Sequence, residues 1–234
     1  MKKLIRRNKL FVSILAILVG CFVLNNKSDS YLRERVVKLV SPKGSCSGEQ
    51  IIAPSGENYI LTAAHCLVLK DANNSIEVIT ESGEHLSRRV IAEDHASDLL
   101  LLEGLPNLKG LSIASSSRNK EEVRTFTHGR GFDTYQTKGV LIQDSRAQML
   151  TEDYNCSLNY SKYKIVEIDL GFFPIKVCII DVIEKATTAL IVPGSSGGMV
   201  VNSYGNLVGV VSAGDGTFGY LVTLSDIQSF LSGY

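Results

Sequence analysis

The chain has 234 residues, of which 44% are hydrophobic and 21% charged, a composition typical of a folded globular protein and not of a disordered one. Basic and acidic residues number 24 each, but five of the basic residues lie within the first nine positions. Subtracting these five leaves 19 basic residues against 24 acidic ones, and this mildly acidic body argues against a nucleic-acid partner.

An uncharged apolar run follows the basic start of the chain, "LFVSILAILVGCFVL" at 10–24. The combination is typical of an export signal or an N-terminal membrane anchor, although a spanning helix needs about 20 residues. The positive flank is expected to stay in the cytoplasm, which would place the rest of the chain on the extracytoplasmic side. "LVGC" at 18–21 resembles a bacterial lipoprotein box ending at Cys21. Retention as an anchor, lipidation and cleavage therefore stay open for this leader.

Four cysteines lie outside the leader, namely Cys46, Cys66, Cys156 and Cys178. Four cysteines allow three pairings, and an oxidising compartment would let them form disulfides. The alternative is that they are reduced and buried as small apolar side chains. No C-x-x-C spacing occurs, so neither a zinc site nor any other metal or cofactor is expected.

Short apolar runs separated by turn residues begin after the polar linker at 25–30. They are rich in Val, Ile and Thr, and Gly, Pro, Asn and Ser occupy the breaks, so each is predicted to be a strand. In the first half these strands are expected at 35–40, 49–53, 59–64, 75–80, 88–93 and 98–103.

A connector at 107–123 divides this half from a second set of predicted strands. Those strands are expected at 123–129, 137–144, 163–170, 175–182, 187–192, 199–213 and 218–224, the run at 199–213 containing a hairpin turn. Ser225 and Gln228 then form a capping-box pattern that predicts a short helix. Many short strands without alternating helices indicate a barrel or sandwich.

The stretch "PGSSGG" at 193–198 contains a G-x-S-x-G pattern centred on Ser196. A serine hydroxyl becomes a nucleophile when an imidazole takes its proton and a carboxylate orients that imidazole. The α/β-hydrolases place the histidine after the serine, but all four histidines here precede Ser196. That enzyme class is therefore excluded, and a flexible Gly/Ser turn is the remaining alternative for this segment.

His65 and Asp98 are the candidate base and acid. His65 follows a predicted strand and precedes Cys66, which a bridge to Cys46 would hold in place. Asp98 precedes four leucines, at the edge of a core where a carboxylate needs a partner. Asp94 is a competitor in the more polar context "AEDHAS". The chain order of base, acid and nucleophile is the one found in chymotrypsin-like proteases.

Three blocks of the sequence resemble the signature blocks of trypsin-like serine proteases, in particular the bacterial HtrA/Deg protease domain without its PDZ domain. They are "LTAAHC" (61–66), "DLLLLE" (98–103) and "PGSSGGMVVNSYGNLVGVVSAG" (193–214). The resemblance implies an all-β fold of two packed antiparallel β-barrels, with a short C-terminal helix and the N-terminal apolar leader. Its expected divisions are a leader and linker at 1–30 and a protease domain at 31–234, comprising a first barrel at about 31–115, a second at about 120–224 and a helix at 225–232.

The resemblance also implies roles for individual residues. His65, Asp98 and Ser196 would hydrolyse peptide bonds of a protein or peptide substrate through an acyl-enzyme. The backbone N–H groups of Gly194 and Ser196 would form the oxyanion hole. Ser212, Ala213 and Gly214 would pair with the substrate backbone. Leu190 would form the floor of the primary specificity pocket, which predicts a preference for small or medium aliphatic residues before the scissile bond.

Three departures from the wider family carry further expectations. Ser195 stands where digestive relatives have the aspartate that pairs with a new N-terminus, so activation by that route is not expected. The segment 145–186 contains Cys156 and Cys178 and is interpreted as a disulfide-pinned insertion near the second barrel. Some proteins of this fold have lost catalysis and serve as binding modules, and that alternative stays open here.

Overall fold

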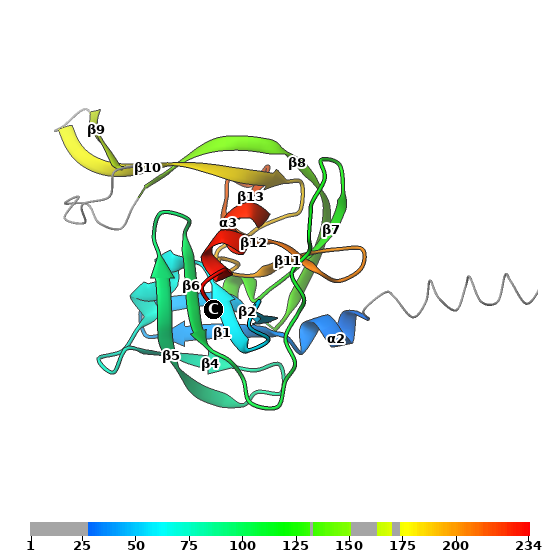
Figure 1. Ribbon diagram of the computed structural model, residues 1–234. Coiled ribbons are helices and arrows are strands. Elements are labelled where there is room, and N and C mark those ends of the chain that lie inside the picture. Colours follow the sequence, from blue (N-terminus) through cyan, green and yellow to red (C-terminus); the bar gives the residue numbers. More distant parts are fainter. Residues whose placement is uncertain (1–27, 132, 151–162, 170–173) are drawn as a thin grey trace, which may run out of the picture.

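The first barrel is formed by six antiparallel strands in the computed structural model, which describes residues 28–131, 133–150, 163–169 and 174–234. The strands close in the order β1-β2-β3-β6-β5-β4 (Figure 1). Their bounds are β1 (Val36–Ser41), β2 (Gly44–Ile52), β3 (Asn58–Thr62), β4 (Ser75–Ile79), β5 (His85–Asp94) and β6 (Leu99–Glu103).

The four leucines of β6 show why this strand lacks the usual polar alternation. Successive side chains of a strand point to opposite faces. Leu100 and Leu102 fill the interior of the first barrel, whereas Leu99 and Leu101 belong to a second apolar cluster shared with the other barrel. Both faces of β6 are therefore buried, and the strand that begins directly after Asp98 is fixed from two sides.

The second barrel is closed by pairing of β10 with β13 and has the order β13-β12-β11-β7-β8-β10. Its strands are β7 (Glu122–Thr127), β8 (Tyr135–Leu150), β10 (Pro174–Thr187), β11 (Met199–Asn202), β12 (Leu207–Gly214) and β13 (Gly219–Val222). Together the two six-stranded barrels confirm the fold class predicted from the sequence.

The predicted insertion at 145–186 consists in large part of strand. The β8–β10 pairing continues to Leu150 and Ile179, and β9 (Tyr163–Asp169) pairs with the other edge of β10. Figure 1 shows β8 and β10 as a long ribbon running past the barrel, with β9 at its far end. The predicted Cys156–Cys178 bridge cannot be placed, since Cys156 lies outside the described residues.

The two barrels pack through a common apolar core. Strands β1, β2, β3 and β6 of the first barrel meet β7, β11 and β12 of the second. The fully buried side chains of this common core include Val36, Ile51, Leu61, Leu99, Leu101, Phe126, Met199, Val201 and Val210. This junction holds residues that are far apart in the sequence at fixed positions, which a site shared by both barrels requires.

Helix α3 (Leu224–Leu231) lies against β12 and ends the described chain. The predicted capping box at Ser225 is wrong, because Thr223 is the N-cap and its side chain accepts a hydrogen bond from the Asp226 N–H. Gln228, the other half of that box, donates instead to the Ala114 carbonyl in the connector at 2.9 Å. The helix therefore begins one residue earlier than predicted.

Two further local predictions need correction. The linker is shorter than predicted, because Ser28 caps a five-residue helix, α2 (Asp29–Arg33). The strand predicted at 187–192 is also wrong, because Thr187 is the last residue of β10 and the chain beyond it is a loop. In this loop, Thr188 N still donates to the Val140 carbonyl oxygen, but side chains make the other contacts with β8: Thr188 Oγ1 accepts from Val140 N and Thr137 Oγ1 donates to Leu190 O.

The leader residues 1–27 lie outside the described residues. Among the helices that are described, none has the length and apolar character needed to cross a membrane.

Candidate active site

His65 lies in a short 3-10 helix, η1 (Ala64–Leu69), that directly follows β3. The neighbouring Cys66 forms a disulfide with Cys46 of β2, which confirms this pairing among the alternatives. The disulfide ties η1 to the barrel wall immediately beside the imidazole. His65 Nδ1 lies 3.0 Å from both carboxylate oxygens of Asp98, and the His65 backbone N–H donates to Oδ1 at 3.0 Å.

Asp98 occupies the left-handed backbone region, with φ of 54°, at the turn just before β6. Its side chain is only 13% exposed and also accepts a hydrogen bond from Ser212 Oγ at 2.7 Å. Burial acts to raise the pKa of Asp98, but the His65 charge and the hydrogen bonds from His65 and Ser212 outweigh it and hold the pKa below its usual value. The carboxylate is therefore ionised and oriented.

The competing carboxylate, Asp94, lies at the end of β5 and binds a backbone N–H group of the turn that follows it. Its Oδ1 accepts a hydrogen bond from the Ala96 N–H at 2.9 Å. The structure therefore brings His65 together with Asp98, as the sequence predicted.

Ser196 lies on the loop between β10 and β11, which is pressed closely against the first barrel. Gly197 has φ of 77°, and a β-carbon there would lie 2.0 Å from Thr62 Oγ1 and 2.3 Å from the Ser47 carbonyl oxygen. Only glycine fits a backbone this close to its neighbour in this conformation. The Gly/Ser segment is therefore a packed part of the barrel junction.

Ser47 on β2 fixes this loop through two hydrogen bonds and makes a third to His128. Its N–H donates to the Ser196 carbonyl oxygen at 2.8 Å and its Oγ donates to the Gly194 carbonyl oxygen at 2.9 Å. The same Oγ accepts from the His128 N–H at 2.8 Å. Sequence reasoning missed Ser47, and the only available signal was its place next to Cys46.

Ser212 on β12 contacts both the candidate acid Asp98 and the candidate nucleophile Ser196. The Ser196 hydroxyl donates to the Ser212 carbonyl oxygen at 3.3 Å, while the Ser212 hydroxyl donates to Asp98. The sequence predicted Ser212 only as a substrate contact. Its position beside Asp98 gives it the further role of connecting the first barrel's carboxylate to the second barrel's nucleophile.

The backbone N–H groups of Gly194 and Ser196 have no acceptor within the described part of the chain. By contrast, the N–H groups of Ser195, Gly197 and Gly198 donate to the carbonyl oxygens of Val192, Val211 and Ser195. Both residues are partly exposed, so these donors can reach water or a ligand. The two open donors are those that the sequence assigned to an oxyanion hole.

Ser195 is fully buried, with its hydroxyl 3.0 Å from Thr127 Oγ1 on β7. The backbone N–H of Val192 donates to the same hydroxyl at 3.5 Å. Ser195 is thus held by its own loop and barrel. These neutral contacts are compatible with the prediction that no new N-terminus is needed at this position.

The predicted specificity pocket involves two neighbouring residues that differ sharply in burial. Leu190 is 51% exposed, whereas Ile191 is 9% exposed. Ile191 lies over two glycines of facing strands, since a β-carbon on Gly214 would lie 2.9 Å from Ile191 Cβ and one on Gly219 would lie 2.4 Å from Ile191 Cγ1. Sequence reasoning missed Ile191 in this place.

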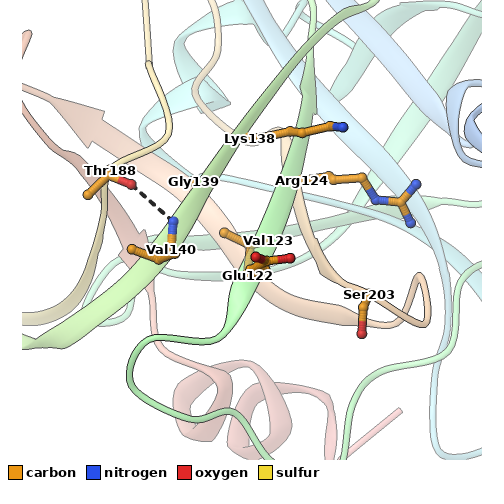
Figure 2. A pocket seen from close by; sticks show the side chains of 8 residues that line it. All are labelled: Glu122, Val123, Arg124, Lys138, Gly139, Val140, Thr188 and Ser203. Carbon is orange, nitrogen blue, oxygen red and sulfur yellow. Dashed lines mark hydrogen bonds between the residues drawn. The ribbon is translucent and has the colours of Figure 1, made fainter.

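A separate hollow lies on the outer face of β7 and β8 (Figure 2). Its volume is about 480 Å³, and Glu122, Arg124, Lys138 and Thr188 are among its lining residues. None of His65, Asp98 and Ser196 lines it, so it is distinct from the site at the barrel junction.

Residues 46–210 match the family of trypsin-like peptidase domains, and this match spans most of the chain. The chain belongs to this family. Membership makes it a serine-type endopeptidase and confirms the resemblance predicted from the three sequence blocks. Comparison with curated proteins found no match.

Solved structures of similar fold include both forms of a mycobacterial protease. The inactive form of the Rv3671c protease from M. tuberculosis is 19% identical, with 90% of this chain and 94% of that chain covered and a TM-score of 0.62. The active form is 18% identical, with coverage of 90% and 85% and a TM-score of 0.65. The serine endoprotease from Yersinia pestis is 18% identical, with coverage of 87% and 64% and a TM-score of 0.61. These likenesses confirm the chymotrypsin-like fold.

Proposed function

We propose that His65, Asp98 and Ser196 form a catalytic triad that hydrolyses peptide bonds through an acyl-enzyme. The observation that carries this proposal is the part-buried contact of His65 Nδ1 with both oxygens of Asp98 at 3.0 Å. An ionised carboxylate at Nδ1 keeps the proton on that nitrogen, so Nε2 is the nitrogen that accepts a proton.

In the proposed reaction the Ser196 hydroxyl turns from the Ser212 carbonyl oxygen to His65 Nε2. His65 takes the proton as Ser196 Oγ attacks the scissile carbonyl, and it then gives the proton to the leaving amine. A water molecule, activated by the same imidazole, hydrolyses the acyl-enzyme. Asp98 stays ionised throughout and stabilises the imidazolium.

The oxyanion that forms at the attacked carbonyl would be bound by the N–H groups of Gly194 and Ser196. Both are open donors, and Ser47 holds the carbonyl oxygens of the same two residues. Such preorganised donors stabilise charge that develops only in the transition state. The substrate backbone would pair with the strand segment of Ser212, Ala213 and Gly214 as an added strand.

For the residue before the scissile bond we propose small or medium aliphatic side chains. Neither Leu190 nor Ile191 offers a charge that would pair with Lys or Arg. Ile191 further narrows the space between Gly214 and Gly219 that such a side chain would enter. A panel of fluorogenic peptides tests this proposal, and a clear preference for Arg or Lys would contradict it.

We further propose that the leader directs the protease domain to the extracytoplasmic side and tethers it through residues 10–24. The basic start and apolar run support this location, and the Cys46–Cys66 disulfide is compatible with an oxidising compartment. Fractionation of cells that express the full chain would find it in the membrane. Release by Cys21→Ser would identify lipidation, and a shortened soluble product would identify cleavage.

Labelling of the full chain with a fluorophosphonate tests the triad directly. We expect covalent labelling that Ser196→Ala abolishes, while Ser203→Ala, a change at an exposed serine, leaves it intact. A well-folded protein that is not labelled and cleaves no peptide would contradict the proposal. That result would instead favour a catalytically silent binding module.

A further inference from the structure

A cluster of potential metal ligands includes the proposed base, His65. Among the described residues, the sulfurs of Cys46 and Cys66 and a ring nitrogen of His65 all lie within 4.8 Å of one another. In this structure the two sulfurs are joined as a disulfide. Strand β2 and helix η1 bring the three side chains together, so the spacing along the sequence does not predict the cluster.

We propose that reduction of the Cys46–Cys66 disulfide creates a Zn²⁺ site formed by Cys46, Cys66 and His65. A small-molecule dithiol reduces the disulfide to two thiols and is itself oxidised to its cyclic disulfide. Zn²⁺ then binds both sulfurs as thiolates and one ring nitrogen of neutral His65, releasing two protons. The fourth position stays open to water.

The ligand set and its dimensions suit zinc. Two cysteines, one histidine and an open position form one of the known catalytic zinc arrangements. Bond lengths of about 2.0–2.3 Å place tetrahedral ligand atoms roughly 3.3–3.8 Å apart. On reduction the two sulfurs, now bonded to each other, must move apart to this spacing, while a sulfur–nitrogen separation of at most 4.8 Å shortens by up to about 1 Å; rotation of the freed cysteine side chains can supply both changes.

The charge balance favours occupation of a site that is largely buried. Cys66 is fully buried and Cys46 is 6% exposed, so an isolated charge there would be costly. Two thiolates neutralise Zn²⁺, and the complex carries no net charge. The imidazole is the open side of the site, because the His65 side chain is 33% exposed.

Asp98 already provides the outer partner that zinc-bound histidines usually have. A metal-ligating imidazole commonly donates its second N–H to a carboxylate, which fixes the ring orientation and raises its basicity. The contact of Asp98 with His65 Nδ1 has this form, leaving Nε2 as the ligand. A bound Zn²⁺ would use the nitrogen that the proposed reaction needs, so the ion would prevent His65 from acting as the base. This consequence rests on the proposed function, whereas the binding of Zn²⁺ does not.

Metal binding by the full chain tests the site without any activity measurement. The protein is reduced with excess dithiol, exchanged into dithiol-free buffer without oxygen, titrated with Zn²⁺, and analysed for retained metal. Cys21, Cys156 and Cys178 are replaced by serine to leave only the two proposed thiols. We expect one Zn²⁺ per reduced chain and none per oxidised chain, and Co²⁺ in place of Zn²⁺ should give a thiolate charge-transfer band.

The dependence on His65 separates this site from adventitious thiol binding. His65→Asn should weaken Zn²⁺ binding by about tenfold or more, as expected for loss of one ligand, whereas His85→Asn, at an exposed histidine of the same barrel, should not. Equal affinity in the two variants, or no binding to the reduced chain, would overturn the proposal. Near-UV circular dichroism follows folding, and a reduced chain that stays unfolded with Zn²⁺ would overturn it as well.

Labelling of Ser196 tests the blocking role separately. One equivalent of Zn²⁺ should slow fluorophosphonate labelling of the reduced chain at least tenfold, chelation should restore it, and the oxidised chain should be unaffected. Unchanged labelling of a chain that retains Zn²⁺ would overturn the blocking role. If the oxidised chain is not labelled at all, the proposed triad fails, while the binding data still decide the metal site.

Discussion

The two barrels contribute to the site in different ways. In the first barrel, His65 and Asp98 contact each other directly, and a disulfide fixes the helix that carries the base. In the second barrel, Ser196 lies on an irregular loop whose Gly194 and Ser196 carbonyl oxygens are bound by Ser47 of the opposite barrel. The proposed base and acid are thus organised within one barrel, whereas the position of the proposed nucleophile depends on the junction. Perturbing each part separately tests this division.

The contact within the first barrel should give the largest effect on catalysis. Asp98→Asn would no longer hold the reactive imidazole tautomer, and we expect kcat to fall by about 10,000-fold with the fold intact. Asp94→Asn is the matched control, because Asp94 serves only its own turn. Hydrolysis of a fluorogenic peptide measures both variants. A comparable loss in the two would remove the assignment of Asp98 as the acid.

The junction contains a carboxyl group whose ionisation should limit stability. Glu49 on β2 is fully buried, and neither of its carboxylate oxygens has a hydrogen-bond partner. Val36 and Leu61 flank it on the adjacent strands. Burial raises the pKa of Glu49 well above its usual value, so over the pH range between the two pKa values the folded chain binds more protons than the unfolded one.

The contribution of Glu49 to the free energy of unfolding should therefore be highest below the usual pKa of 4.5 and decrease as the pH rises toward the folded-state pKa. The decrease contributed by Glu49 approaches about 1.4 kcal/mol per pH unit. Glu49→Gln should remove it and stabilise the protein at neutral pH, while Glu84→Gln, at an exposed site, should not. Urea unfolding at several pH values measures the difference, and parallel profiles for Glu49→Gln and the wild type would contradict this account.

The link between the barrels at Ser47 should matter less than the acid but still measurably. Ser47→Ala removes the hydroxyl that binds the Gly194 carbonyl oxygen and the His128 N–H. Loss of such buried hydrogen bonds costs about 1–3 kcal/mol, and if it falls on the transition state, kcat/KM drops roughly 5- to 150-fold. Ser45→Ala on the same strand is the control. An unchanged kcat/KM would show that the loop does not need this link.

The smallest effect is expected at the specificity pocket, where two neighbouring side chains can be compared. Ile191→Ala should open the space over Gly214 and Gly219 and shift preference toward larger aliphatic residues, by roughly tenfold relative to alanine. Leu190→Ala should change this ratio less, because its side chain is half exposed. Peptides that differ only before the scissile bond measure the ratios. A larger shift for Leu190→Ala would show that Leu190, the predicted pocket floor, determines the preference more strongly than Ile191 does.

The sequence predicted those features that local pattern encodes. Runs of Val, Ile and Leu indicated nearly every strand, and the three blocks around His65, Asp98 and Ser196 indicated the site because such residue combinations recur in one order. Contacts across the barrel junction were not predictable, because they join residues far apart in the chain. Ser47 and Glu49, two residues apart on β2, illustrate this: the hydroxyl of Ser47 makes two hydrogen bonds and the carboxylate of Glu49 makes none, and no local pattern distinguishes them.

The segment at 187–192 shows a second limit. Its apolar residues match a strand, yet beyond Thr187 the chain turns away to form the loop that carries Ser196. Ile191 then packs over two glycines instead of joining a sheet. Hydrophobic pattern reports burial, but the kind of burial is decided by partners elsewhere in the chain.

The contacts of α3 bear on the order in which the molecule assembles during synthesis. The Tyr234 ring packs against Tyr59 at 6.2 Å between centroids, and the Tyr234 carbonyl oxygen accepts from the Ser55 N–H. These contacts join the β2–β3 hairpin to residues translated about 175 positions later. As the chain leaves the ribosome, the first barrel can fold early, but this corner stays uncovered until Tyr234 has been synthesised and has emerged. Docking of the helix therefore follows folding of the first barrel, and nascent chains arrested before residue 224 should be cut preferentially at this hairpin by added protease.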